Sequence, residues 1–185
     1  MQQYDETLSA GLAARSRRYQ LVERALEGLF RWLWMVRNRQ YEGRAWLRLA
    51  REEWAPAAGE APHPVYGKIL ARVLDVQANW LAHPQLARER VAQALAIAEA
   101  HADRAEVAFC QWMLGVACMG YPQHDYETAL AYFHQSMHYY HTSEDQFRVA
   151  QLLQDMGHAY HRLWQLDKAA EYQERSFALR REMGD

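Results

Sequence analysis

The stretch AQLLQDMGHAYHRLWQLDKAAEYQERSFALRREMGD, residues 150–185, decides the fold class. Apolar and small residues recur at helical spacing in two segments, one around Gly157 and one around Ala169. The short break between them, with Leu166 and Asp167 at the expected turn, predicts a pair of antiparallel helices. One such hairpin cannot bury its own apolar face, so we expect it to stack on similar hairpins.

The hairpin repeats along the chain with a period of about forty residues. The first helices match at Gly115 and Gly157. The second helices match at pairs of small residues seven positions apart, namely Ala87 and Ala94, Ala129 and Ser136, and Ala169 and Ser176. The chain shows no alternation of β-branched and polar residues. The pattern therefore predicts an all-α fold without a sheet, an α–α superhelix of about four helical hairpins.

The repeat divides the chain into six segments. We expect a leading helix or frayed terminus at 1–15, a divergent aromatic-rich hairpin at 16–55, a Pro- and Ala-rich connector at 56–64, a regular hairpin at 65–102, a hairpin with a longer loop at 103–144, and a last hairpin at 145–185, with truncation of the array at this end as one alternative.

The last hairpin resembles tetratricopeptide (TPR) repeats, through Gly157, Tyr160, Ala169 and the closing ALRREMGD. More narrowly, it resembles the sensor arrays of bacterial STAND-class signalling NTPases, the maltose-activator-like and AfsR-like regulators. The opening of such arrays is matched by Tyr41, Glu42, Gly43, Arg44, Trp46 and Leu47. The resemblance covers residues 17–185. The chain departs from the pattern where Trp164 replaces the usual glycine before the hairpin turn.

The resemblance implies a non-catalytic module that binds a protein, a peptide or a small effector in a concave groove, within a larger STAND-type NTPase or transcriptional regulator. By position, the groove residues are Arg72, Val76, Asn79, Phe109, Trp112, Val116, Met119, Gln151, Gln154, Asp155, His158 and His161. For Phe109 we favour packing inside the array over exposure, whereas for Trp112 the two alternatives stay open.

Other functions remain as alternatives to effector binding. The chain could be a structural segment that self-associates through its terminal hairpins, or a small standalone TPR adaptor. Adjacent domains or repeats of a parent protein would also be partners, because the apolar residues near the end of 150–185 suit a following repeat. We therefore expect a piece excised from a longer protein.

Catalytic and metal sites find little support in the sequence. His134, His138 and His141 share one helical face, but no carboxylate or cysteine is placed to complete a zinc site. Asp155 with two nearby histidines could form an acid/base cluster, yet no nucleophile accompanies it. Gly67-Lys68 lacks the glycine spacing of a phosphate-binding loop. We expect no enzyme activity, no metal and no cofactor.

Charge and composition bound the remaining classes. Residues 15–51 hold ten arginines and three glutamates, but the arginines are spread at helical spacing, which favours a solvated or docking face over nucleic-acid binding. No apolar run is long enough to span a bilayer. Cys110 and Cys118 lie eight residues apart on one predicted helix, too far apart for a disulfide. These features predict a cytoplasmic protein.

Overall fold

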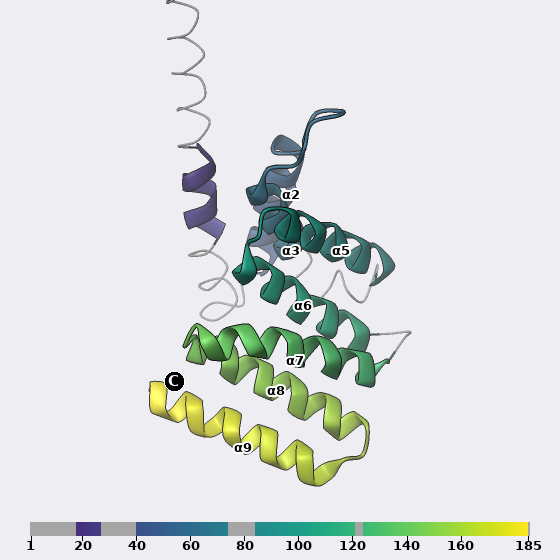
Figure 1. Cartoon of the computed structure of the whole chain (residues 1–185), viewed down its shortest axis with the longest axis vertical. Helices are drawn as coiled ribbons and strands as arrows, with labels where there is room; N and C mark the ends of the chain where they lie inside the picture. The colour runs from purple at the N-terminus through teal and green to yellow at the C-terminus, as the bar shows by residue number, and fades with distance from the viewer. Residues whose placement is uncertain (1–17, 27–39, 74–83, 121–123, 185) are drawn as a thin grey trace, which may run out of the picture. The chain divides into compact units, whose positions relative to one another are not determined.

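The computed structural model describes residues 18–26, 40–73, 84–120 and 124–184, and these residues form helices and loops without a strand. The prediction of an all-α helical-repeat fold is confirmed for the described residues. Within them, no helix combines the length and hydropathy that crossing a bilayer requires. The helices, labelled in Figure 1, are a segment at 18–26, α2 (Gln40–Glu53), α3 (Pro64–Val73), α5 (Pro84–Ala100), α6 (Arg104–Met119), α7 (Tyr126–Thr142), α8 (Gln146–Arg162) and α9 (Leu166–Met183).

The chain divides into two compact units, Met1–Val73 and Leu74–Asp185. The boundary falls inside the segment 65–102, for which the sequence predicts one hairpin. Each unit has its own helices, with α2 and α3 in the first and α5 to α9 in the second.

A small apolar cluster holds the first unit together. Its buried members are Leu26, Leu47, Ala50, Val65 and Ile69. The Tyr19 ring lies between the ring of His63, stacked with centroids 3.4 Å apart, and the ring of Trp54, with centroids 4.7 Å apart. These rings fix the connector, which contains His63, against the helical segment that contains Tyr19.

The second unit is a stack in which each helix packs on the next one along the chain, from α5 to α9 (Figure 1). The small residues that defined the repeat lie on α5, α7 and α9. All six are buried: Ala87, Ala94, Ala129, Ser136, Ala169 and Ser176. Burial of small residues lets two helix backbones approach closely.

The two matched serines make the same hydrogen bond in successive hairpins. The Ser136 hydroxyl donates to the carbonyl oxygen of Ala108 at 2.7 Å, and the Ser176 hydroxyl donates to the carbonyl oxygen of Ala150 at 2.7 Å. Both bonds join the second helix of a hairpin to the first helix, near its start. They fix how far one helix is shifted along the axis of the other.

The turns also repeat. Asp103, Asp125 and Asp145 each cap the following helix by accepting a hydrogen bond from a backbone N–H in its first turn. The turn inside the last hairpin was expected at Leu166-Asp167, but Leu166 already opens α9. The chain reverses instead around Trp164, which has a φ of 60°. This left-handed conformation is costly for a large side chain and would suit glycine.

Two further sequence features have clear places in the structure. Cys110 and Cys118 are buried on α6 and are not joined by a disulfide. At the end of α9, Gly184 adopts a left-handed conformation with a φ of 77°, and its N–H donates to the carbonyl of Arg180. The helix is thus closed by a glycine cap rather than frayed.

Candidate functional site

The predicted groove residues of the second unit lie on α6 and α8, the first helices of two successive hairpins. These two helices contact each other directly as well as through α7. Arg72 lies in the first unit, where its guanidinium donates to the carbonyl of Lys68 at 3.1 Å. Val76 and Asn79 lie outside the described residues.

The aromatic residues of α6 are not open to solvent. Phe109 is 1% exposed and Trp112 is 3% exposed, and their rings meet edge to face with centroids 6.0 Å apart. Both rings are therefore packed inside the array. This is the alternative that the sequence favoured for Phe109, and one of the two that it left open for Trp112. Val116 and Met119, further along α6, are half-buried.

Arg148, in the first turn of α8, covers these rings. The carbon of its guanidinium lies 5.0 Å from the ring centroid of Phe109 and 5.6 Å from that of Trp112. It also lies 5.6 Å from the ring centroid of Tyr140, on α7. A planar cation over aromatic faces is favourable and excludes water from them. Arg148 therefore joins three consecutive helices.

Asp155 on α8 is the ionisable group most affected by this packing. The indole Nε1 of Trp112 donates a hydrogen bond to its Oδ2 at 2.7 Å. Burial raises the pKa of Asp155 to about 6, against the lowering effects of the Trp112 hydrogen bond and of the nearby Arg180 charge. Among the described residues, Trp112 is the only one that donates a hydrogen bond to this carboxylate.

Gln154 is turned toward α9 rather than toward solvent. Its side-chain oxygen accepts a hydrogen bond from Arg180 at 2.5 Å. Its backbone carbonyl accepts another from the side chain of Gln173 at 3.1 Å. These two contacts hold the last two helices together, so Gln154 acts in the structure of the hairpin.

The remaining groove residues of α8 form a polar row. Gln151, Asp155 and His158 are spaced at i, i+4 and i+7, which places them on one face of the helix. Gln151 and Asp155 are half-buried, whereas His158 is exposed. His161, also exposed, lies about a quarter turn away from this row. We call Gln151, Asp155 and His158 the α8 row.

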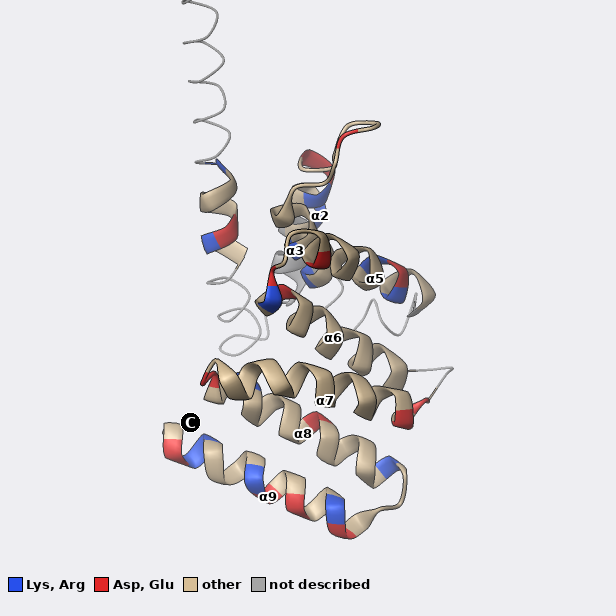
Figure 2. Ribbon diagram, viewed as in Figure 1, with Lys and Arg blue, Asp and Glu red and all other residues tan. Residues whose placement is uncertain are grey.

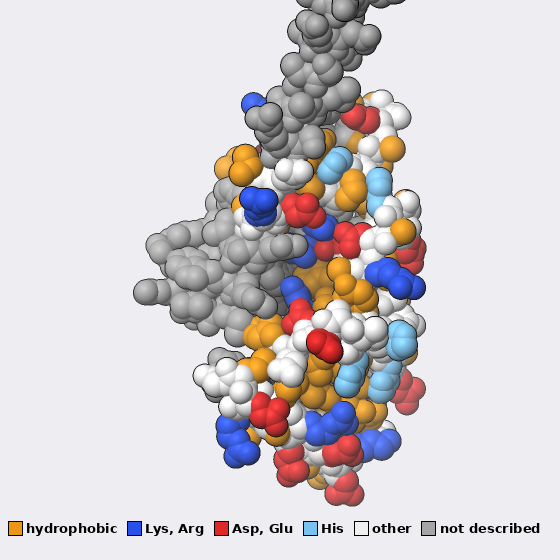
Figure 3. Space-filling view, turned by 60° about the vertical axis from the view of Figure 1, so that its left-hand side comes forward, with side chains coloured by type: hydrophobic (Ala, Val, Ile, Leu, Met, Phe, Trp, Pro, Cys, Tyr) orange, Lys and Arg blue, Asp and Glu red, His pale blue; other side chains and the backbone are white. Residues whose placement is uncertain are grey.

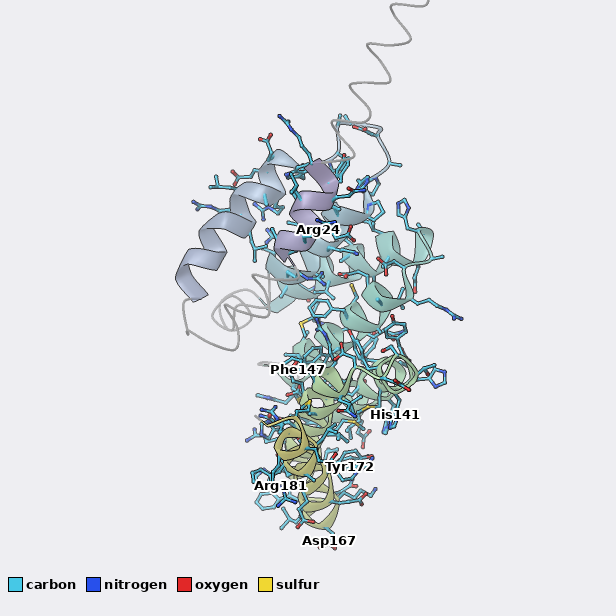
Figure 4. All side chains as sticks on the ribbon, turned by 90° about the vertical axis from the view of Figure 1, so that its left-hand side faces the viewer. Arg24, His141, Phe147, Asp167, Tyr172 and Arg181 are labelled. Atoms are coloured by element: carbon cyan, nitrogen blue, oxygen red, sulfur yellow. The ribbon has the colours of Figure 1, made fainter. Side chains whose placement is uncertain are left out.

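The histidines of α7 lie on the surface. His134, His138 and His141 are all exposed. Figure 3 shows a group of histidine side chains over the C-terminal stack, and Figure 4 shows His141 at its outer side. No three histidine, cysteine or carboxylate side chains of the described residues come together as metal ligands would.

Arg148 and Tyr140 are the contacts that sequence reasoning missed. Arg148 is the third residue after the cap Asp145, a position where Glu or Gln usually completes a capping box. The equivalent residue after Asp103 is Glu106, which follows the rule. A cation in the first turn of a helix opposes the helix dipole, and this departure was the available signal of a tertiary role.

No protein-family model matches the chain, and no curated protein matches its sequence. Its structure is similar to the crystal structure of BtubC (BKLC) from P. vanneervenii, with a TM-score of 0.62 and 17% sequence identity. The similarity covers 90% of this chain and 74% of BtubC. At this level of identity, the similarity supports the helical fold that the two proteins share.

Proposed function

We propose that the chain is a non-catalytic, TPR-like binding module that recognises a basic group of a peptide, protein or small effector at the α8 row. The observation that carries the proposal is the Asp155 carboxylate, held by Trp112 at 2.7 Å. Trp112 fixes one carboxylate oxygen, and a carboxylate can accept several hydrogen bonds. A cation from a partner would supply the donors and the charge that the second oxygen requires.

The two neighbours of Asp155 on the row suit such a ligand. Gln151 lies one turn before it and can donate and accept hydrogen bonds. His158 lies one turn after it and is exposed. A ligand with a basic head and a polar backbone, such as a lysine- or arginine-bearing peptide, matches a carboxylate flanked by an amide and an imidazole. Arg180 is the internal competitor, and its hydrogen bond to Gln154 keeps it occupied.

The biological setting that we propose is effector sensing within a bacterial STAND-type signalling NTPase or regulator, in the cytoplasm. The support is the resemblance of residues 17–185 to the sensor arrays of that class, together with the buried Cys110 and Cys118, which are not joined by a disulfide. A structural segment or a standalone TPR adaptor is the second candidate. The exposed surface of α9 favours it, because that surface could serve assembly without any effector.

Selection from a library of immobilised peptides tests the binding proposal. The matched variants are Asp155→Asn, which keeps an acceptor for Trp112 and removes the charge, and Glu99→Gln, which removes a charge from the exposed surface of α5. We expect the selected peptides to carry lysine or arginine, and Asp155→Asn to weaken binding about tenfold, about 1.4 kcal/mol. Glu99→Gln should bind as the unchanged chain does. Selected peptides without basic residues, or equal binding by both variants, would contradict the proposal.

A second experiment tests the setting separately. The coding sequence that precedes Met1 in the natural gene should encode a phosphate-binding loop of the GxxxxGK[ST] type if the chain belongs to a STAND NTPase. A gene without such a loop would contradict the STAND setting and leave the binding proposal intact.

A further inference from the structure

The outer face of α9 carries exposed apolar side chains in one row. Phe177 is 69% exposed and Leu166 is 53% exposed, and Ala170 between them is also exposed. Their spacing places all three on one side of the helix. Figure 1 shows α9 as the last layer of the stack, with no described helix on its far side. We call Leu166, Ala170 and Phe177 the α9 face.

The equivalent face of α7 is covered by a helix. Forty residues before the α9 face lie Tyr126, Leu130 and Met137, on the helix against which α8 packs. Leu130 is 8% exposed there. The hydroxyl of Tyr126 accepts a hydrogen bond from Nε of Arg162, in the last turn of α8, at 2.9 Å. In this stack, that side of a second helix is therefore a surface that receives another helix.

The charges of α9 favour a second α9 in the antiparallel direction. Its first half, residues 166–174, has three acidic residues and one lysine, a net charge of −2. Its second half, residues 175–183, has three arginines and one glutamate, a net charge of +2. Figure 2 shows both signs along the helix. Even without the exposed Glu171–Arg175 pair, at 3.4 Å within the helix, the halves keep opposite signs.

We propose that the α9 face is a docking surface for the α9 face of a second copy of this chain, antiparallel about a two-fold axis near Gln173 and Glu174. In that register Phe177 lies opposite Ala170 of the second copy, and the same contact occurs twice. A large side chain then meets a small one, as helix packing requires. Asp167 lies beside the exposed Arg181 of the second copy, because Arg180 is held by Gln154 within its own chain.

The ends of the helix carry the charge contacts of this pairing. Asp167 and Arg181, labelled in Figure 4, are both exposed and lie toward opposite ends of α9. An antiparallel pair brings each next to its opposite charge twice. The helix has 18 residues, a length of about 27 Å. A contact along one helix is a small interface, so we expect a weak dimer with a Kd of about 10 μM.

This proposal uses a different face from the α8 row and is independent of the proposed function. Sedimentation velocity of the full chain, from about 1 to 100 μM, tests it. We expect a monomer–dimer equilibrium for the unchanged chain and a monomer throughout for Phe177→Glu. The matched control is Leu49→Glu, which places the same charge at an exposed leucine of the first unit, 59% exposed, and should dimerise as the unchanged chain does.

Charge exchange tests the antiparallel register. Asp167→Arg and Arg181→Glu should each weaken self-association about tenfold, because each places like charges opposite one another. An equimolar mixture of the two variants should restore the dimer, since every contact then pairs opposite charges. A chain that stays monomeric at the highest concentration, as it would if the face is reserved for a helix of another protein, overturns the proposal. So does a dimer that persists in Phe177→Glu, or a mixture no stronger than its parts.

Discussion

The two hairpins α6–α7 and α8–α9 share a framework of matched hydrogen bonds and turns, but they differ in the side chains that pack between their helices. Matched serines make hydrogen bonds of the same length, 2.7 Å, to matched carbonyls. Matched turn residues, His124 and Trp164, both have positive φ, 47° and 60°. Matched small residues and turn conformations are thus common to the two hairpins.

The side chains packed between the helices change from apolar in the α6–α7 hairpin to polar in the α8–α9 hairpin. The row Phe109, Trp112, Met113, Val116 and Met119 on α6 becomes Gln151, Gln154, Asp155, His158 and His161 on α8. On the second helices, the buried Phe133 and Tyr140 of α7 become Gln173 and Arg180 on α9. Among the described helices, α5 and α8 cover the inner hairpin on its two sides, whereas α9 packs on α8. Polar side chains therefore replace apolar ones on this common backbone where fewer described helices cover it.

The largest expected contrast is between alanine substitutions at the two matched glycines. A Cβ at Gly115 would lie 2.5 Å from Cε1 of Phe133, a buried ring, and 3.0 Å from the carbonyl oxygen of Ala129. A Cβ at Gly157 would lie 2.7 Å from the side-chain nitrogen of Gln173, which is flexible. We expect Gly115→Ala to cost about 3 kcal/mol. Gly157→Ala should change stability by less than about 1 kcal/mol, because alanine also favours the helix.

Urea unfolding monitored by circular dichroism measures both glycine variants. Equal losses in the free energy of unfolding for the two variants would contradict the expected difference in packing between the two hairpins.

The next contrast concerns Asp155, whose counterpart on α6 is the buried Met113. The pKa of Asp155 is raised from 3.8 to about 6 in the folded chain. Between these values the folded chain binds more protons than the unfolded chain, so stability falls as pH rises through this range. We expect Asp155→Asn to stabilise the chain by about 2 kcal/mol at pH 8 and to have no such effect below pH 4, by the same linkage.

Thermal unfolding at a series of pH values checks the Asp155 prediction, with Glu99→Gln on α5 as the exposed control. A variant that is less stable than the unchanged chain at pH 8 would show that the carboxylate is stabilised, not strained, by its surroundings.

The matched serines should behave alike. Ser136→Ala and Ser176→Ala each remove one buried hydrogen bond between the helices of a hairpin. We expect each to cost about 1 kcal/mol. Chemical unfolding of both variants side by side measures the two losses. A loss of stability in only one of the two variants would show that the matched hydrogen bonds do not contribute equally in the two hairpins.

The smallest effect is expected at the start of α9. The caps Asp103, Asp125 and Asp145 accept a backbone hydrogen bond, whereas Gln165 at the start of α9 makes no side-chain cap. We expect Gln165→Asp to stabilise the chain by about 0.5 kcal/mol. Thermal unfolding near neutral pH measures the gain, and Gln165→Asn is the uncharged control. No gain from either would show that the Trp164 turn does not admit the cap geometry.

Sequence spacing located the framework because small residues and caps act locally. The glycines and the small-residue pairs from Ala87 to Ser176 specify helix contacts through backbone approach, which depends on spacing alone. Burial of Phe109 and Trp112 depends instead on Arg148, which arrives from the next hairpin. The pKa of Asp155 depends on the same covering. Such contacts are set by three helices at once, and the period of one helix cannot predict them.

The Trp112–Asp155 hydrogen bond also has a mechanical consequence. α6 and α8 belong to different hairpins and both pack on α7, yet this bond joins them directly. Bending the stack so that α6 and α8 separate must stretch the bond and lift Arg148 from its aromatic rings. In a helical-repeat stack each repeat contacts only its neighbours, so the stack resists bending through these contacts. Trp112 and Asp155 therefore stiffen the stack at the contact between α6 and α8, and Arg148 adds to the stiffness there.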